Sequence, residues 1–170
     1  CVLIFRDVSE RRRFEKEEAR RFLDARLLAS IVESSDDAII SKSLDGVIQT
    51  WNAGAERVFG FTAEQAVGRH ISLIIPPDRI SDEDRIIASL KAGQRIEHFE
   101  TERMRSDGGR ILVSLTVSPI KNAQGRVMGA SKIVRDISER KAAEVALIEK
   151  EKLAATGRLR GRRGDGVAVR

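Results

Sequence analysis

Residues 133–140 read Ile-Val-Arg-Asp-Ile-Ser-Glu-Arg, and residues 4–11 read Ile-Phe-Arg-Asp-Val-Ser-Glu-Arg. Six of the eight positions are identical, at a separation of 129 residues. This separation is far longer than the period of a solenoid repeat and has the length of a whole domain. We therefore expect the same junction, an apolar strand followed by a charged helix, at both ends of one folded unit.

The second copy of this motif predicts how a sheet is joined to a helix. Ser138 precedes a run rich in Glu, Lys and Arg, and it suits an N-cap whose hydroxyl accepts from a backbone N–H of the first turn. Asp136 lies just upstream, where a carboxylate favours the positive end of the helix dipole. Together with Arg135, these residues are the predicted coupling point between the sheet and the trailing helix.

Two charged helices are predicted to flank the unit, a linker helix over residues 9–33 and a C-terminal signalling helix over residues 137–157. Apolar side chains recur along the first helix, largely every four residues: Phe14, Phe22, Leu23, Leu27 and Ile31. A similar stripe follows Ala143, Leu147 and Ala154 in the second. Such stripes suit the pairing of parallel helices. We therefore expect a homodimer formed through the flanking helices and the sheet.

Between the two junctions the sequence predicts two strands, several short helices, a longer helix and three more strands. Asp45-Gly46 between two apolar runs indicates a hairpin. Thr62-x-x-Gln65 has the form of a capping box, and Ser81–Ala92 is the longer helix. Turns containing Gly separate strands predicted over 96–105, 111–120 and 127–136. This order predicts an α+β fold with a five-stranded antiparallel sheet.

The amino-acid composition excludes several classes of function. The 170 residues are 41% hydrophobic and 34% charged, and no apolar run approaches the length that crosses a bilayer. The net charge is +5, but residues 158–170 hold five Arg and one Asp, so the remainder carries only +1. Because aromatic residues for base stacking are also scarce, we expect no nucleic-acid partner. One Cys and two His predict neither a disulfide framework nor a structural zinc site.

Residues 25–136 resemble a PAS domain. The motifs that carry the resemblance, in order, are Leu44-Asp45-Gly46, the run WNAGAERVFGF (51–61), Val67-Gly68-Arg69-His70, Ile75-Pro76-Pro77-Asp78, Arg105-Ser106-Asp107-Gly108-Gly109 and the closing VRDISER (134–140). The resemblance implies a PAS domain over 34–136, with a sheet curled around a small cavity and short helices on one face. Residues 1–8 would then be the last strand of a preceding PAS-like unit.

The resemblance also implies a regulatory role. PAS domains usually drive an attached histidine kinase or cyclic-nucleotide enzyme through the exit helix, so we expect a cytoplasmic sensory and dimerisation module that is not itself an enzyme. Residues 151–159 resemble the start of the dimerisation helix of sensor histidine kinases, but no phospho-accepting His follows. Residues 158–170 are predicted to be a basic disordered tail, either native or the product of a shifted reading frame. The alternative is a ligand-free dimerisation spacer.

No catalytic or metal site is predicted, and the cofactor stays open. Haem-binding PAS sensors carry a His on the longer helix, and Ser81–Ala92 has none. Cysteinyl-flavin sensors need a Cys inside the domain, and Cys1 lies outside it. The acidic run Asp82-Glu83-Asp84 is expected to favour the helix dipole in the first turn. The predicted cavity lining, which core packing explains equally well, is Ile40, Ile48, Phe59, Ile75, Leu90, Phe99, Leu115 and Ile133.

Overall fold

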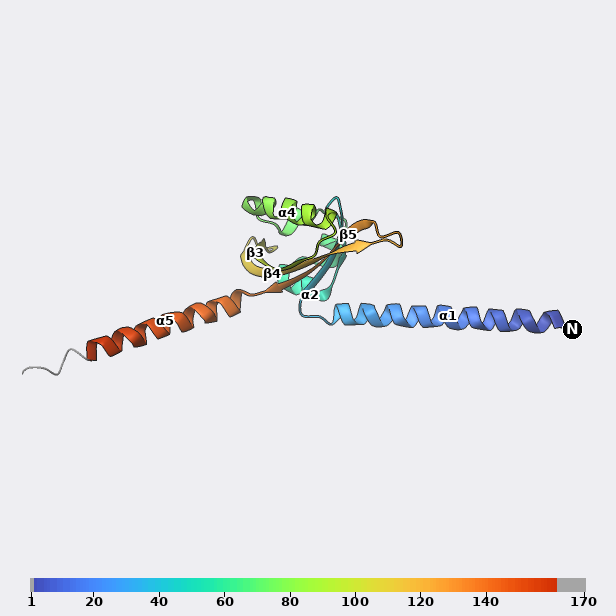
Figure 1. The fold of residues 1–170 in the computed structure, drawn as a ribbon, viewed down its shortest axis with the longest axis horizontal. Helices are drawn as coiled ribbons and strands as arrows, with labels where there is room; N and C mark the ends of the chain where they lie inside the picture. Colours follow the sequence, from blue (N-terminus) through green and yellow to red (C-terminus); the bar gives the residue numbers. More distant parts are fainter. Residues whose placement is uncertain (1, 162–170) are drawn as a thin grey trace, which may run out of the picture.

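The structure, a computed structural model, describes residues 2–161, with side chains described from residue 8 to residue 158. A five-stranded antiparallel sheet in the order β2-β1-β5-β4-β3 lies between two long helices, α1 (Val2–Glu33) and α5 (Ser138–Gly161). Figure 1 shows α1 and α5 extending from the domain in opposite directions. The predicted α+β class with a five-stranded antiparallel sheet is confirmed.

The five strands lie in the predicted order, the last three within one residue of their predicted ranges. Their bounds are β1 (Ala38–Ser43), β2 (Ile48–Trp51), β3 (Ile96–Met104), β4 (Arg110–Lys121) and β5 (Val127–Asp136). In β4 every second residue from Ile111 to Val117 is buried, as expected for a strand with one covered face. β5 lies at the centre of the sheet, where it pairs with β1 and β4. The strand that leads into α5 is therefore held on both sides.

Short helices connect β2 to β3 and cover one face of the sheet. They are α2 (Ala53–Phe59), α3 (Ala63–Ala66), the 3-10 turns η1 (Ile71–Ile74) and η2 (Pro77–Arg79), and α4 (Ile80–Lys91). The predicted capping box is present, since the Thr62 hydroxyl accepts from Gln65 N and the Gln65 side chain accepts from Thr62 N. Gly60 ends α2 with φ of 76°, a left-handed conformation that Gly adopts without strain.

The hydrophobic core lies between this helical layer and the sheet. Ile86 and Leu90 of α4 and Phe59 of α2 pack against the inward residues of the strands, among them Leu115. Trp51 closes one side of the core, where its ring lies 5.5 Å from that of Phe59 and its Nε1 donates to Phe61 O over 3.0 Å. The core thus holds α2 and α4 firmly against the sheet.

Two predicted boundaries are wrong. Residues 2–8 begin helix α1 and are not a strand, although Ile4, Arg6 and Asp7 repeat residues at the end of β5. The end of β5 is extended because β1 and β4 pair with it, whereas residues 2–8 pair with no strand of the described chain. At the other end, α5 includes residues 158–161 of the predicted tail. The rest of that tail, 162–170, lies outside the described residues.

Candidate functional site

Five charged side chains are buried inside the domain, between the helical layer and the sheet. Lys42 from β1, Lys132 from β5 and Arg103 from β3 are only 1%, 2% and 2% exposed. All three side chains converge on Asp82 and Glu83, which are also buried in the first turn of α4. We call these five residues the interior charge cluster.

Glu83 holds two lysines from neighbouring strands. Lys132 Nζ donates to Glu83 Oε2 over 2.6 Å, and Lys42 Nζ donates to Glu83 Oε1. Burial alone raises the pKa of Glu83, but the charges of Lys132 and Lys42 outweigh it and hold that pKa below its usual value of 4.5. Burial lowers the pKa of Lys132 from 10.5 to about 8, against the opposing charge of Glu83. Glu83 therefore ties α4 to the central strand and its neighbour.

The other carboxylate of the cluster, Asp82, faces β3. Thr101 Oγ1 donates to Asp82 Oδ2 over 2.6 Å, and Arg103 Nη1 lies 3.7 Å from the same oxygen. Arg103 Nη1 also donates to Thr101 Oγ1 and to Glu102 O. The second terminal nitrogen, Arg103 Nη2, is buried and has no hydrogen-bond partner in the described part of the chain. A buried donor of this kind is costly to leave unsatisfied.

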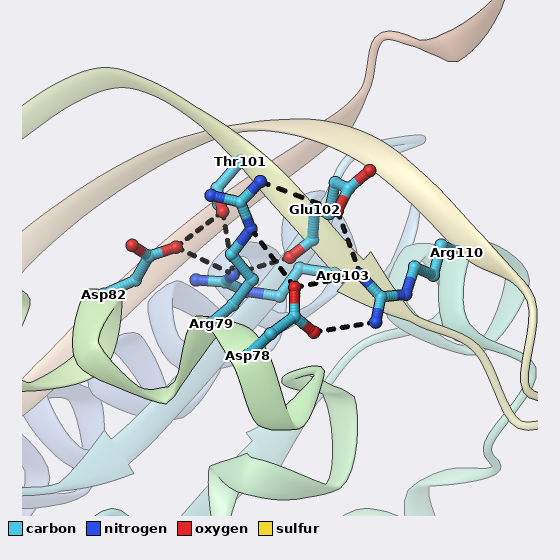
Figure 2. A network of polar contacts seen from close by, with 7 residues as sticks. All are labelled: Asp78, Arg79, Asp82, Thr101, Glu102, Arg103 and Arg110. Carbon is cyan, nitrogen blue, oxygen red and sulfur yellow. Dashed lines mark hydrogen bonds and ion pairs between the residues drawn. The ribbon is translucent and has the colours of Figure 1, made fainter.

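A second group of charges lies beside the first but at the surface. Figure 2 shows Asp78, Arg79, Glu102 and Arg110 next to the buried Asp82, Thr101 and Arg103, between the helical segment and β3. Arg110 donates to both oxygens of Asp78, over 2.7 and 3.1 Å, and to Glu102 over 3.2 Å. The bond from Arg110 lowers the pKa of Asp78. We call these four residues the surface ion network.

The residues predicted to line a cavity lie in the core, with one exception. Six of them are buried and Phe99 is partly buried against the core: Ile40, Ile48, Phe59, Ile75, Leu90, Leu115 and Phe99. Ile133, however, is 40% exposed and lines a depression on the outer face of the sheet. Its neighbour Lys132 points inward instead, so choosing the apolar residue selected the wrong face of β5.

Sequence reasoning missed the interior charge cluster. The expected effect of the helix dipole fits the position of Asp82 and Glu83 in the first turn of α4, but it leaves out their partners on the sheet. The available signal was the strand period: Ile40 and Lys42 share a face of β1, as do Thr101 and Arg103 on β3 and Lys132 and Val134 on β5. Charged residues in phase with core residues indicate a buried ionic group.

The N-terminal edge of the domain is fixed by Asn52. Its Oδ1 accepts from Ala55 N over 2.9 Å, which caps α2, and also from Ile39 N over 2.8 Å. Its Nδ2 donates to Val32 O in the last turn of α1 over 2.8 Å. One buried amide thus joins α1, β1 and α2.

Arg135 joins the entry to the exit of the domain. Its Nε and Nη2 donate to the two oxygens of Asp37, over 3.0 and 2.7 Å, and Asp37 directly precedes β1. This bidentate bond raises the pKa of Arg135. Arg135, which is predicted to take part in coupling, therefore links the end of β5 to the segment that follows α1.

At the exit, β5 passes into α5 through a single residue, Ile137, which is buried. Ile137 N donates to Leu112 O of β4, and its carbonyl accepts from Lys141 N, both over 2.9 Å. Asp136 Oδ1 accepts from Ser138 N over 2.9 Å. Asp136 thus bonds to the first residue of α5, which agrees with its predicted position near the positive end of the helix dipole.

The predicted capping role of Ser138 is wrong. Its hydroxyl accepts from Leu112 N over 3.2 Å and therefore bonds to β4 rather than to the first turn of α5. The reason is the position of the helix start: Ile137 supplies the first helical carbonyl, which places Ser138 inside the first turn. Ser138 consequently ties the helix to the sheet instead of capping it.

The described residues hold neither a metal site nor a membrane-spanning helix. Among residues 8–158, no group of three or more His, Cys, Asp or Glu side chains is placed to hold a metal ion. None of the described helices is long and apolar enough to cross a membrane.

Comparison with known proteins identifies the fold. The family model described as PAS fold matches residues 26–137. Two-component system protein A of Emericella nidulans is 37% identical over 116 residues, which cover 66% of this chain and 17% of that protein. Signal transduction histidine-protein kinase AtoS of Escherichia coli K12 is 28% identical over 130 residues, covering 76% of this chain and 21% of the kinase.

A solved structure agrees with these relatives. The crystal structure of the PAS domain of a protein from Colwellia psychrerythraea is 28% identical, has a TM-score of 0.61, and covers 69% of this chain and 98% of that one. The chain spans only about a fifth of the length of the two relatives named above. The chain belongs to the PAS-fold family, as a sensory module homologous to the PAS domains of sensor histidine kinases.

Proposed function

We propose that this chain is the cytoplasmic regulatory segment of a histidine kinase, in which changes inside the PAS domain or at a dimer interface pass through β5 into α5. The observation that supports it most is the continuity of β5. This central strand carries Lys132 of the interior charge cluster, bonds to the entry segment through Arg135, and meets α5 after Ile137 alone. A shift of the strand therefore has a direct path to the helix. Kinase activity would belong to other parts of the parent protein.

The flanking helices support the dimer in this proposal. α1 exposes a row of large apolar side chains that a second copy would cover: Phe14, Phe22, Leu23, Leu27, Leu28 and Ile31. α5 exposes another row: Val145, Leu147, Ile148 and Leu153. Parallel pairing of both helices would bury these residues and place two output domains side by side.

Asp136 provides the direct test. We expect Asp136→Ala, in the chain joined in helical register to a histidine-kinase core, to change autophosphorylation several-fold. The reason is that removing the bond to Ser138 N loosens the connection, and couplings of about 1–3 kcal/mol correspond to changes of roughly 5- to 150-fold. The thermal midpoint should fall little, because one cap contributes about 1 kcal/mol.

Asp45→Ala is the matched control, since Asp45 is an exposed carboxylate in the β1–β2 turn. It should leave autophosphorylation unchanged. If Asp136→Ala gives the same kinase activity as Asp45→Ala, the sheet does not act through this junction and the proposed path is wrong.

The filling of the core favours a second candidate, a ligand-free dimerisation spacer. Ile40, Phe59, Leu90 and Leu115 occupy the predicted cavity and are at most 1% exposed. Native mass spectrometry of the purified chain, with an absorption spectrum, separates the two candidates. A stoichiometric bound compound supports the sensor, whereas a clean apo dimer supports the spacer.

A further inference from the structure

The interior charge cluster carries one positive charge too many. Its three cations, Lys42, Arg103 and Lys132, face two carboxylates, those of Asp82 and Glu83. Apart from these five, no ionisable side chain among residues 8–158 is buried, so the excess is not offset inside the domain. Leaving a buried charge uncompensated costs several kcal/mol. An anion bound beside these three cations would restore the charge balance of the cluster.

The unsatisfied donor lies on one residue of that cluster. Arg103 Nη1 donates to Glu102 O and Thr101 Oγ1 and forms an ion pair with Asp82, while the buried Nη2 has no hydrogen-bond partner among the described residues. The lysines also have spare donors, because an ammonium carries three N–H groups and each is seen using one, toward Glu83. Donors from β1, β3 and β5 thus surround the same interior.

We propose that the interior charge cluster binds a small monocarboxylate, which accepts a hydrogen bond from Arg103 Nη2 and offsets the excess positive charge. This inference rests on the proposed sensory function and names the class of its ligand. A planar carboxylate matches the fork of a guanidinium. A dianion such as sulfate would place a second negative charge beside Asp82 and Glu83, so a monoanion fits the charge balance better.

Binding of a carboxylate at this site would also act on the elements that lead to α5. The ligand would share its cations with Asp82 and Glu83, which hold the first turn of α4 to the sheet. Lys132 lies four residues before Asp136 on β5, the strand that leads into α5. Occupancy of the site therefore changes the forces on α4 and on the strand that the proposed function uses.

The test is a titration of the full chain with acetate, followed by the backbone amide resonances of Thr101, Arg103 and Lys132. We expect saturable shifts with acetate and none with acetamide, the neutral molecule of the same shape. Arg103→Gln should weaken acetate binding about ten-fold or more, since a hydrogen bond to a charged group contributes about 1.5–3 kcal/mol. Arg126→Gln, at an exposed Arg in the β4–β5 turn, should bind acetate as the parent does.

A second variant and a pH series keep the result interpretable. Arg103→Lys retains the buried charge and should fold, yet bind more weakly because the fork is lost. Affinity should also fall as pH rises through about 8, where Lys132 loses its proton beside Lys42, Arg103, Asp82 and Glu83.

Three results would overturn the carboxylate assignment: no saturable acetate shift, equal shifts with acetamide or chloride, or acetate binding that Arg103→Gln leaves unchanged. The kinase fusion distinguishes this failure from that of the proposed function. If acetate does not bind while Asp136→Ala still alters autophosphorylation, the ligand class is wrong and the sensory path stands.

Discussion

Two groups of charges lie side by side where the helical segment meets β3, and they differ in exposure. In the interior charge cluster, Lys42, Arg103 and Lys132 have almost no contact with solvent. In the surface ion network, the side chains of Asp78 and Arg110 are about half exposed, although their bonds have better geometry than the Asp82–Arg103 contact. The geometry of the bonds therefore does not show which charges control the stability and response of the domain. Exposure to solvent is the property that distinguishes the two groups.

The physical reason is the competition between desolvation and attraction. Charges at the surface keep most of their hydration, so forming a pair there contributes about 0–1 kcal/mol. Charges in the interior have lost their hydration, so removing one partner leaves the others without compensation. The interior cluster is consequently the more sensitive group, and small changes in it have large effects.

The largest expected effect is that of Glu83→Gln. Glu83 is the carboxylate that pairs with both buried lysines. Its neutralisation leaves the positive charges of Lys42 and Lys132 close together without the negative charge that compensates them. We expect the free energy of unfolding to fall by about 3–5 kcal/mol, measured by urea denaturation at pH 7. The control is Asp84→Asn, since Asp84 is the next residue of α4 and is exposed. Equal losses in the two variants would show that burial does not distinguish these positions.

A pH series gives the next largest effect. The pKa of Lys132 is about 8 in the folded chain against an ordinary 10.5, so between these values the unfolded state binds more protons. Stability from this group therefore rises with pH across that window. We expect a gain of roughly 1–2 kcal/mol from pH 8 to 9.5, because each pH unit contributes at most about 1.36 kcal/mol.

Lys132→Met identifies the source of that gain. The variant should lack the rise between pH 8 and 9.5. The parent chain should lose stability below pH 4.5, where Glu83 becomes protonated in the unfolded state before the folded one, and the variant should lose less because the charge of Lys132 helps to lower the pKa of Glu83. A parallel rise in the two chains would assign the effect to groups other than Lys132.

The same difference explains how far the sequence predicts this molecule. The hairpin at Asp45-Gly46 and the capping box of Thr62 and Gln65 are local signals, and the structure confirms them. The role of Lys132 depends on Glu83, which lies 49 residues away in the sequence. Local chemistry favoured the apolar Ile133 as the inward residue, and only the tertiary partner makes an inward lysine stable.

Residues 2–8 give the converse case. Residues 4–7 match residues 133–136 at the end of β5 at three of four positions, yet they form helix. The end of β5 is a strand because Val113 and Ser114 on β4 and Ala38 on β1 pair with its last residues. The motif therefore specifies the helix that follows it more strongly than the strand that precedes it. Ser138 is a further example in which a tertiary contact outweighs the local pattern, since its hydroxyl bonds to Leu112 of β4 and not to its own helix.

The smallest expected effect comes from the surface ion network and sharpens the comparison most. Arg110→Gln removes the bonds to Asp78 and Glu102, which are short and well aligned. Because solvent replaces them, the free energy of unfolding at low salt should fall by no more than about 1 kcal/mol. The loss should be smaller still at 1 M NaCl, because the Debye length there is about 3 Å and exposed charges are largely screened from one another. A loss at low salt as large as that of Glu83→Gln would mean that the network shields Arg103 and Asp82 from water, and that the two groups act as one.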